Sequence, residues 1–124
     1  MNSPRRVDLD LGDGHTLRFL EWDPDPDLNP QYADLPPEEF HHGAIIGHVR
    51  SDGSYCEGVI TFDTPRARRG WAGHPMWTVE SRDPLTLSPS LLCTAPRFGP
   101  DNKPIAGTEC GDHGFIRGGR WVRA

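Results

Sequence analysis

The chain has 124 residues, of which 35% are hydrophobic, so we expect one domain with a thin core. Its net charge of −5 disfavours a dedicated nucleic-acid binder, because affinity for nucleic acid depends on neutralising phosphates. No apolar run approaches the ~20 residues of a membrane span, and the first residues lack the apolar centre of a signal peptide. These features predict a cytoplasmic protein without a membrane segment.

The first predicted element is a β-hairpin within residues 1–22. In VDLDLGDGHTLRF, Leu9 and Leu11 alternate with aspartates before GDG turns the chain. Leu17 and Phe19 then resume the period of two, which is typical of strands with one buried face.

Residues 23–43 follow as an acidic, proline-rich connector. Proline removes backbone donors and acidic side chains avoid burial, so this segment is expected to run extended over the surface. A short helical turn could begin at Pro36 or Pro37, because proline suits the first helical position. Residues 44–63 read as a second hairpin around the turn signal SDG.

The remaining chain reads as a basic loop, TPRARRGWAGHP, and then a C-terminal part over residues 75–124. MWTVES predicts a strand, DPLTLSPSLLC an extended segment, and FIRGGRWV a closing hairpin that turns at its two glycines. The whole chain, 1–124, is therefore predicted to be one mainly β domain of about seven short antiparallel strands with proline-rich irregular segments.

Charge is distributed unevenly between the two halves. Residues 1–63 contain 13 acidic and 4 basic side chains, whereas residues 64–124 contain 5 acidic and 9 basic ones. One interpretation is that both faces are solvated and that their opposite charges draw the halves together. The other is a basic patch for an acidic partner or a phosphate. Its arginines would be Arg66, Arg68, Arg69, Arg97, Arg117, Arg120 and Arg123.

Tryptophans bear on the same question. Trp77 and Trp121 are expected to pack in or at the edge of the core. Trp71 stands among arginines in the basic loop, where packing and partner contact are equally good interpretations. The candidate partner-binding residues are Arg66, Arg68, Arg69 and Trp71.

Three cysteines without an export signal favour a metal or thiol role over disulfides. Cys110 and His113 stand at a C-x2-H spacing on a glycine-containing turn, a spacing that can direct both side chains at one metal ion. Cys93 precedes them by a loop of sixteen residues that can fold back. Zinc binding contributes roughly 10–16 kcal/mol in small domains, which would compensate for a thin core. We therefore expect a structural zinc ion held by Cys93, Cys110 and His113.

The fourth ligand is left open between Cys56, a third thiol, and His74, in a loop before a strand. The other histidines follow as weaker candidates, each more readily explained as a surface or core residue: His41, His42 and His48. A water in the fourth position would make the site catalytic, with Glu109 or Asp112 as general base. The alternative without metal is that Cys93 is a buried hydrophobe and His113 bonds to backbone.

The segment PMWTVES…DPLTLSPSLLC followed by CGDHGFIRGGRW resembles an uncharacterised family of small phage and bacterial proteins, grouped as a domain of unknown function. The family shows a Ser-Pro-Ser segment ending in cysteine, a Cys/His turn and an aromatic-Ile-x-x-Gly hairpin, and the resemblance covers roughly residues 75–122. It implies a phage or phage-derived origin and a metal site at Cys93, Cys110 and His113. Relatives encoded beside ubiquitin-like conjugation genes imply an accessory role there.

These observations favour a non-enzymatic, zinc-stabilised module that binds another protein, located in the host cytoplasm if a phage encodes it. A virion structural or decoration protein is the first alternative, because proline-rich arms order on assembly. The second alternative is a metal-dependent hydrolase. The identity of the protein partner and the oligomeric state stay open.

Overall fold

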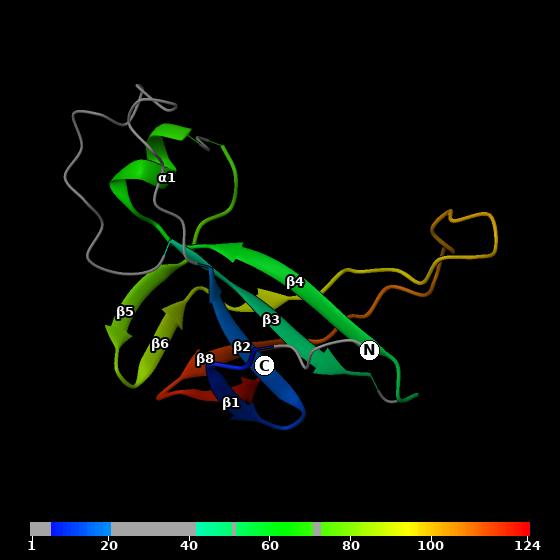
Figure 1. The fold of residues 1–124 in the computed structure, drawn as a ribbon, viewed down its shortest axis with the longest axis horizontal. Helices are drawn as coiled ribbons and strands as arrows, with labels where there is room; N and C mark the ends of the chain where they lie inside the picture. The colour runs from blue at the N-terminus through cyan, green and yellow to red at the C-terminus, as the bar shows by residue number, and fades with distance from the viewer. Residues whose placement is uncertain (1–5, 21–41, 51, 71–72) are drawn as a thin grey trace.

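The computed structural model describes residues 6–20, 42–50, 52–70 and 73–124. Within these ranges the protein is mainly β, with nine antiparallel strands and one short helix, which confirms the predicted fold class (Figure 1). The strand number exceeds the predicted one because the segment DPLTLSPSLLC contains two separate strands, which pair with different neighbours.

A four-stranded antiparallel sheet contains both N-terminal hairpins in chain order. Both hairpins were predicted from alternating hydrophobicity, and the GDG turn has positive φ angles at Gly12, Asp13 and Gly14. The strands are β1 (Leu9–Gly12), β2 (His15–Leu20), β3 (Gly43–Val49) and β4 (Tyr55–Thr61).

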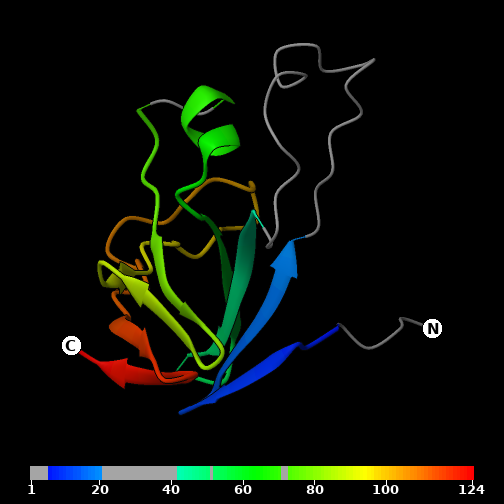
Figure 2. The ribbon, with the colours of Figure 1, turned by 90° about the vertical axis from the view of Figure 1, so that its left-hand side faces the viewer.

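A second layer, formed by the C-terminal half, faces this sheet (Figure 2). It contains a hairpin of two strands and a three-stranded antiparallel sheet in the order β7-β8-β9. Its strands are β5 (Thr78–Arg82), β6 (Leu85–Ser88), β7 (Leu91–Leu92), β8 (His113–Arg117) and β9 (Arg120–Arg123).

The core lies between the two layers. From the four-stranded sheet, Leu17 and Ile46 meet as cross-strand partners and both are buried. From the second layer, Leu87, Ile116 and Trp121 pack into the same cluster. Alternate residues of each strand reach this cluster, as the period of two predicts. The prediction that Trp121 packs in the core is confirmed.

Trp77 packs partly buried against the same cluster and donates its indole N–H to the Ser90 carbonyl oxygen at 3.2 Å. Its predicted packing role is likewise confirmed.

Helix α1 (Pro65–Gly70) replaces part of the predicted basic loop. Thr64 caps it by accepting the Ala67 backbone N–H at 3.1 Å, and Pro65 occupies the first helical position. No helix in the described ranges is long and apolar enough to cross a membrane. The expected connector at 23–43 lies outside the described ranges up to residue 41, as does its helical turn at Pro36 or Pro37, and its last residue, Gly43, begins β3.

Residues 94–110 form an arm that projects away from both sheets (Figure 1). Its two sides are hydrogen bonded to each other: Ile105 N–H donates to the Arg97 carbonyl at 2.8 Å, and Cys110 N–H donates to the Ala95 carbonyl at 3.0 Å. The arm therefore closes on itself, as the sequence predicts, and brings Cys93 and Cys110 together at its base.

Candidate metal centre

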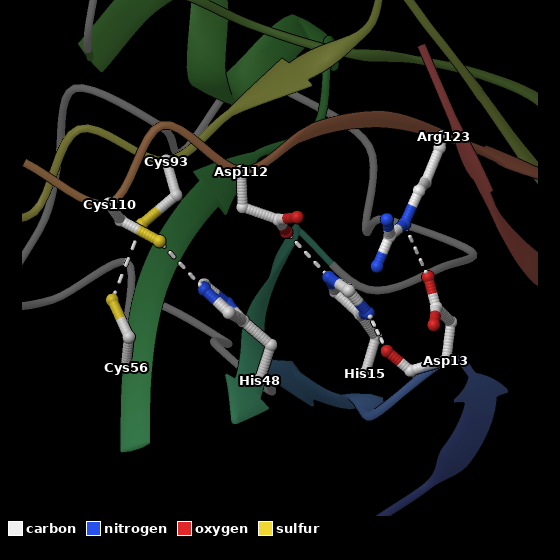
Figure 3. A network of polar contacts seen from close by, with 8 residues as sticks. All are labelled: Asp13, His15, His48, Cys56, Cys93, Cys110, Asp112 and Arg123. Carbon is white, nitrogen blue, oxygen red and sulfur yellow. Dashed lines mark hydrogen bonds and ion pairs between the residues drawn. The ribbon is translucent and has the colours of Figure 1, made fainter. Parts of the chain in front are cut away.

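Three thiols and one imidazole converge where the arm meets the four-stranded sheet (Figure 3). The ligand atoms of His48, Cys56, Cys93 and Cys110 all lie within 4.8 Å of one another. The Sγ atoms of Cys56 and Cys93 are 3.3 Å apart, and His48 Nε2 is 2.9 Å from Cys110 Sγ. These four residues are called the Cys3His cluster below.

The four-stranded sheet supplies two members of this cluster through its register. His48 on β3 stands directly opposite Cys56 on β4. His48 follows the buried Ile46 on the same side of β3, and Cys56 lies on the same side of β4 as the buried Ile60. The inward side of these two strands thus contributes the apolar Ala44, Ile46 and Ile60 and ends in a thiol and an imidazole.

The second layer supplies Cys93 and Cys110 from two adjacent backbone segments. Cys93 N–H donates to the Asp112 carbonyl at 2.8 Å, and Gly111 N–H donates back to the Cys93 carbonyl at 2.8 Å. Gly111 has a φ of 71°, a left-handed turn that glycine adopts without strain. This turn lets Cys110 face the sheet while the chain continues into β8.

The distances in the cluster suit one tetrahedral zinc ion. Zinc–sulfur bonds of about 2.3 Å place tetrahedral sulfurs about 3.8 Å apart, and the cluster's spacings of 2.9 Å up to a limit of 4.8 Å span that value. All three cysteines are free thiols. A set of three cysteines and one histidine is a usual composition of structural zinc sites.

Burial favours the neutral forms of two cluster members. It raises the pKa of Cys93 to about 12, to which hydrogen bonds from the Cys56 and Cys110 thiols add while a backbone contact at Ala95 opposes. Burial also lowers the pKa of His48, against the attraction of Asp112. A neutral imidazole is the form that binds metal, whereas the thiols must lose their protons on binding.

Arg50 lies beside the sulfur atoms. Its guanidinium donates to the Ala95 carbonyl at 3.0 Å and approaches Cys56 Sγ at 3.5 Å. The contact with Cys56 is the main cause of a raised Arg50 pKa. A cation at this distance offsets the negative charge that three thiolates leave on a bound divalent ion.

A second polar group adjoins the Cys3His cluster. His15 Nε2 lies 2.6 Å from Asp112 Oδ2, and its Nδ1 lies 2.7 Å from the Asp13 carbonyl oxygen. The ring is buried, and it stacks on Trp121 at 4.0 Å between ring centres and on His48 at 5.1 Å. Each ring nitrogen faces an oxygen atom, and the contact with Asp112 clamps the Asp112 segment to β2.

The ligand atoms of His15, His48 and Asp112 also lie within 4.8 Å of one another. These residues line a wide groove of about 820 Å³. His48 is shared with the Cys3His cluster, and the nitrogens of His15 are already matched to oxygens. The geometry therefore favours the sulfur-rich set as the metal site and the His15–Asp112 pair as its support.

Of the predicted ligands, the structure brings Cys56, Cys93 and Cys110 together and leaves His113 apart. His113 is exposed on β8, with Nε2 2.8 Å from Ser90 Oγ. The reason is strand alternation: after the Gly111 turn the chain is extended, so the His113 side chain faces away from the sulfurs. His74, the other candidate for the fourth position, is exposed and lies outside the cluster.

His48 takes the fourth position, although a surface or core role was the favoured interpretation of this histidine. A usable signal was present, because His48 continues the alternation of Ala44 and Ile46 on the buried face. Pairing the predicted hairpin around SDG would have placed it opposite Cys56.

The predicted partner-binding residues are not equivalent. Arg66 is only 8% exposed, so helix packing removes it from any contact surface. Arg68 is exposed but forms hydrogen bonds of 2.6 and 3.0 Å with Asp63, which lower the pKa of that carboxyl. Arg69 is exposed, and Trp71 lies outside the described ranges.

Two other arginines, both in the second half of the chain, form ion pairs with acidic residues of the first half. Arg123 lies 2.9 Å from Asp13, and Arg97 forms an ion pair with Asp52. These contacts fit the interpretation in which opposite charges draw the halves together.

Comparison with protein-family models, curated protein sequences and solved structures found no match for the chain.

Proposed function

We propose that this chain is a non-enzymatic, zinc-stabilised β domain that binds another protein, with one structural zinc ion held by His48, Cys56, Cys93 and Cys110. The observation that carries the proposal is the convergence of four ligand atoms of suitable chemistry within 4.8 Å. A zinc ion here would link β3 and β4 to the base of the arm and to β8.

The composition of the site supports a structural rather than a catalytic ion. Catalytic zinc sites keep one position for water, whereas four protein ligands complete a tetrahedron. Asp112, expected as a possible general base, is bound to His15 at 2.6 Å. Glu109, the other possible base, is exposed and outside the two groups of candidate ligands. A hydrolase is therefore the weaker candidate.

Exposed apolar side chains support a binding role. Val59 is 66% exposed on β4, Leu92 is 57% exposed on β7 and Phe98 is 60% exposed on the arm. Val59 and Leu92 also line one groove of the surface, and exposed apolar side chains that lie together in this way are typical of protein-binding sites.

Metal analysis of the full chain tests the zinc assignment. We expect one zinc per chain in protein purified without an affinity tag, and loss of the near-ultraviolet circular dichroism of folded protein when a chelator removes it. His48→Ala should lower zinc affinity by orders of magnitude, while His113→Ala, at the histidine outside the cluster, should retain one equivalent. A chain that folds fully without metal would contradict the proposal.

Co-precipitation with purified candidate partners tests the binding role separately. Zinc-loaded protein that hydrolyses model ester, peptide or phosphate substrates, with activity lost in His48→Ala, would replace the binding role with catalysis.

A further inference from the structure

A narrow apolar groove of about 310 Å³ lies between the edges of the two layers. Its two walls are consecutive backbone segments, residues 57–60 of β4 and residues 91–95 around β7. β4 is the last strand of the four-stranded sheet and β7 the first of the three-stranded sheet. The groove is therefore bordered by two sheet edges, with Trp77 and Trp121 among its lining residues.

On β4, the backbone N–H and C=O groups of every second residue point toward this groove. Phe62 N–H donates to the His42 carbonyl at 2.8 Å, so the backbone N–H of Phe62 points toward β3. Antiparallel alternation then turns the N–H and C=O of Val59 and Thr61 to the opposite edge. Thr61 confirms this, because its carbonyl accepts the Trp77 backbone N–H at 2.9 Å.

The segment around β7 does the same from the other wall. Both backbone groups of Cys93 bond away from the groove, to Asp112 and Gly111, at 2.8 Å each. Alternation therefore turns the groups of Leu92 and Thr94 toward the groove. Among the backbone hydrogen bonds of the described residues outside the strand ladders, none engages Leu92 or Thr94.

The chain itself shows how this edge accepts a strand. Trp77 pairs in parallel with Phe62 at one end of β4, and Asp63 N–H donates to the Trp77 carbonyl at 2.8 Å. The paired stretch stops there, and the groove continues along β4 toward the Cys3His cluster, where Cys93 and His48 line it. An added strand would extend an existing pairing.

Charge in the groove has one sign. Its charged lining residues among the described residues are Glu57 and Asp112, both acidic, and no lysine or arginine lines it. Val59 and Leu92 add exposed apolar side chains on the two walls.

We propose that this groove binds an extended segment of a partner protein, which adds as a strand to β4 and alternates apolar residues with lysine or arginine. Backbone hydrogen bonds to the strand edge would supply affinity, and alternate side chains would supply specificity. The inference deepens the proposed binding role and rests on it. Zinc binding would affect the shape of the groove, because Cys93 lines the end of the groove and also belongs to the Cys3His cluster.

A phage-displayed library of random dodecapeptides, selected on the zinc-loaded full chain, provides the probe. We expect the enriched peptides to alternate apolar and basic residues. Synthetic copies should bind the zinc-loaded full chain, as measured by fluorescence anisotropy. Val59→Lys and Leu92→Lys should weaken that binding about tenfold or more through like-charge repulsion at the edge. Both positions are more than half exposed, so these variants should fold.

Val7→Lys is the matched control, because Val7 is 51% exposed and does not line the groove. It should leave peptide binding unchanged. Selection of no binding peptide, or of peptides that bind Val59→Lys and Leu92→Lys as tightly as the parent, would overturn the inference. Zinc content and circular dichroism of the same samples separate the two proposals: folded protein with one zinc and no peptide binding refutes the groove alone.

Discussion

The His15–Asp112 pair should contribute to stability independently of the metal ligands, and Asp112→Ala tests this. The substitution leaves the Nε2–H of His15 without its acceptor in a site where the His15 side chain is 4% exposed. A buried donor left unsatisfied costs about 1–3 kcal/mol, and hydrogen bonds to charged groups lie in the upper part of that range. Because the Asp112 side chain is 24% exposed, water can replace part of the lost contact. We expect the free energy of unfolding to fall by about 2 kcal/mol.

Asp112→Asn separates charge from hydrogen bonding. Its amide oxygen can still accept from His15, so about half of the effect should return, leaving a loss of about 1 kcal/mol. Urea denaturation at a fixed excess of zinc, followed by tryptophan fluorescence, gives these values when the slope against urea is unchanged.

Asp101→Ala is the control for these two variants. Asp101 is exposed on the arm, and among the described residues only the neighbouring Lys103 N–H donates to it, at 3.2 Å; its replacement should change stability by less than about 0.5 kcal/mol. If Asp112→Ala stays within that same margin while keeping one zinc, the pair does not clamp the fold and the reasoning is wrong.

Two further substitutions test the packing of the second layer. A Cβ at Gly114 would lie 2.5 Å from Trp121 Cζ2, so Gly114→Ala should destabilise the protein by about 1–3 kcal/mol in thermal unfolding. Gly58→Ala should be tolerated, because no neighbour from the described part of the chain lies within 4 Å of the added methyl; equal effects would contradict the packing described. Trp77→Phe removes the indole hydrogen bond to the Ser90 carbonyl and should cost about 1 kcal/mol in urea denaturation, and an unchanged midpoint would count against that bond.

Local patterns were sufficient to predict the hairpins. The alternation of Leu9 and Leu11 with aspartates, the GDG turn and the SDG turn all act between residues close in sequence, where the period of two determines which face is buried. Helix α1 was missed because its start depends on the cap at Thr64, and six residues carry too little periodicity to indicate a helix.

The metal ligands show where local reasoning ends. Cys93 and Cys110 were predicted together because one loop joins them. His113 was favoured by its short spacing from Cys110, but the extended backbone of β8 turns it toward Ser90. His48 contacts Cys110 across 62 residues of chain, and that contact depends on how the two layers face each other. Layer packing of this kind is not encoded in spacing along the sequence.

X-ray absorption at the zinc K-edge of the purified full chain tests the central claim most directly. The Cys3His cluster predicts three sulfur neighbours at about 2.3 Å and one nitrogen neighbour at about 2.0–2.1 Å. His48→Ala should remove the nitrogen contribution or the zinc itself, and His113→Ala should leave the spectrum unchanged. A first shell of two sulfurs and two nitrogens, or one of oxygen and nitrogen only, would contradict this account.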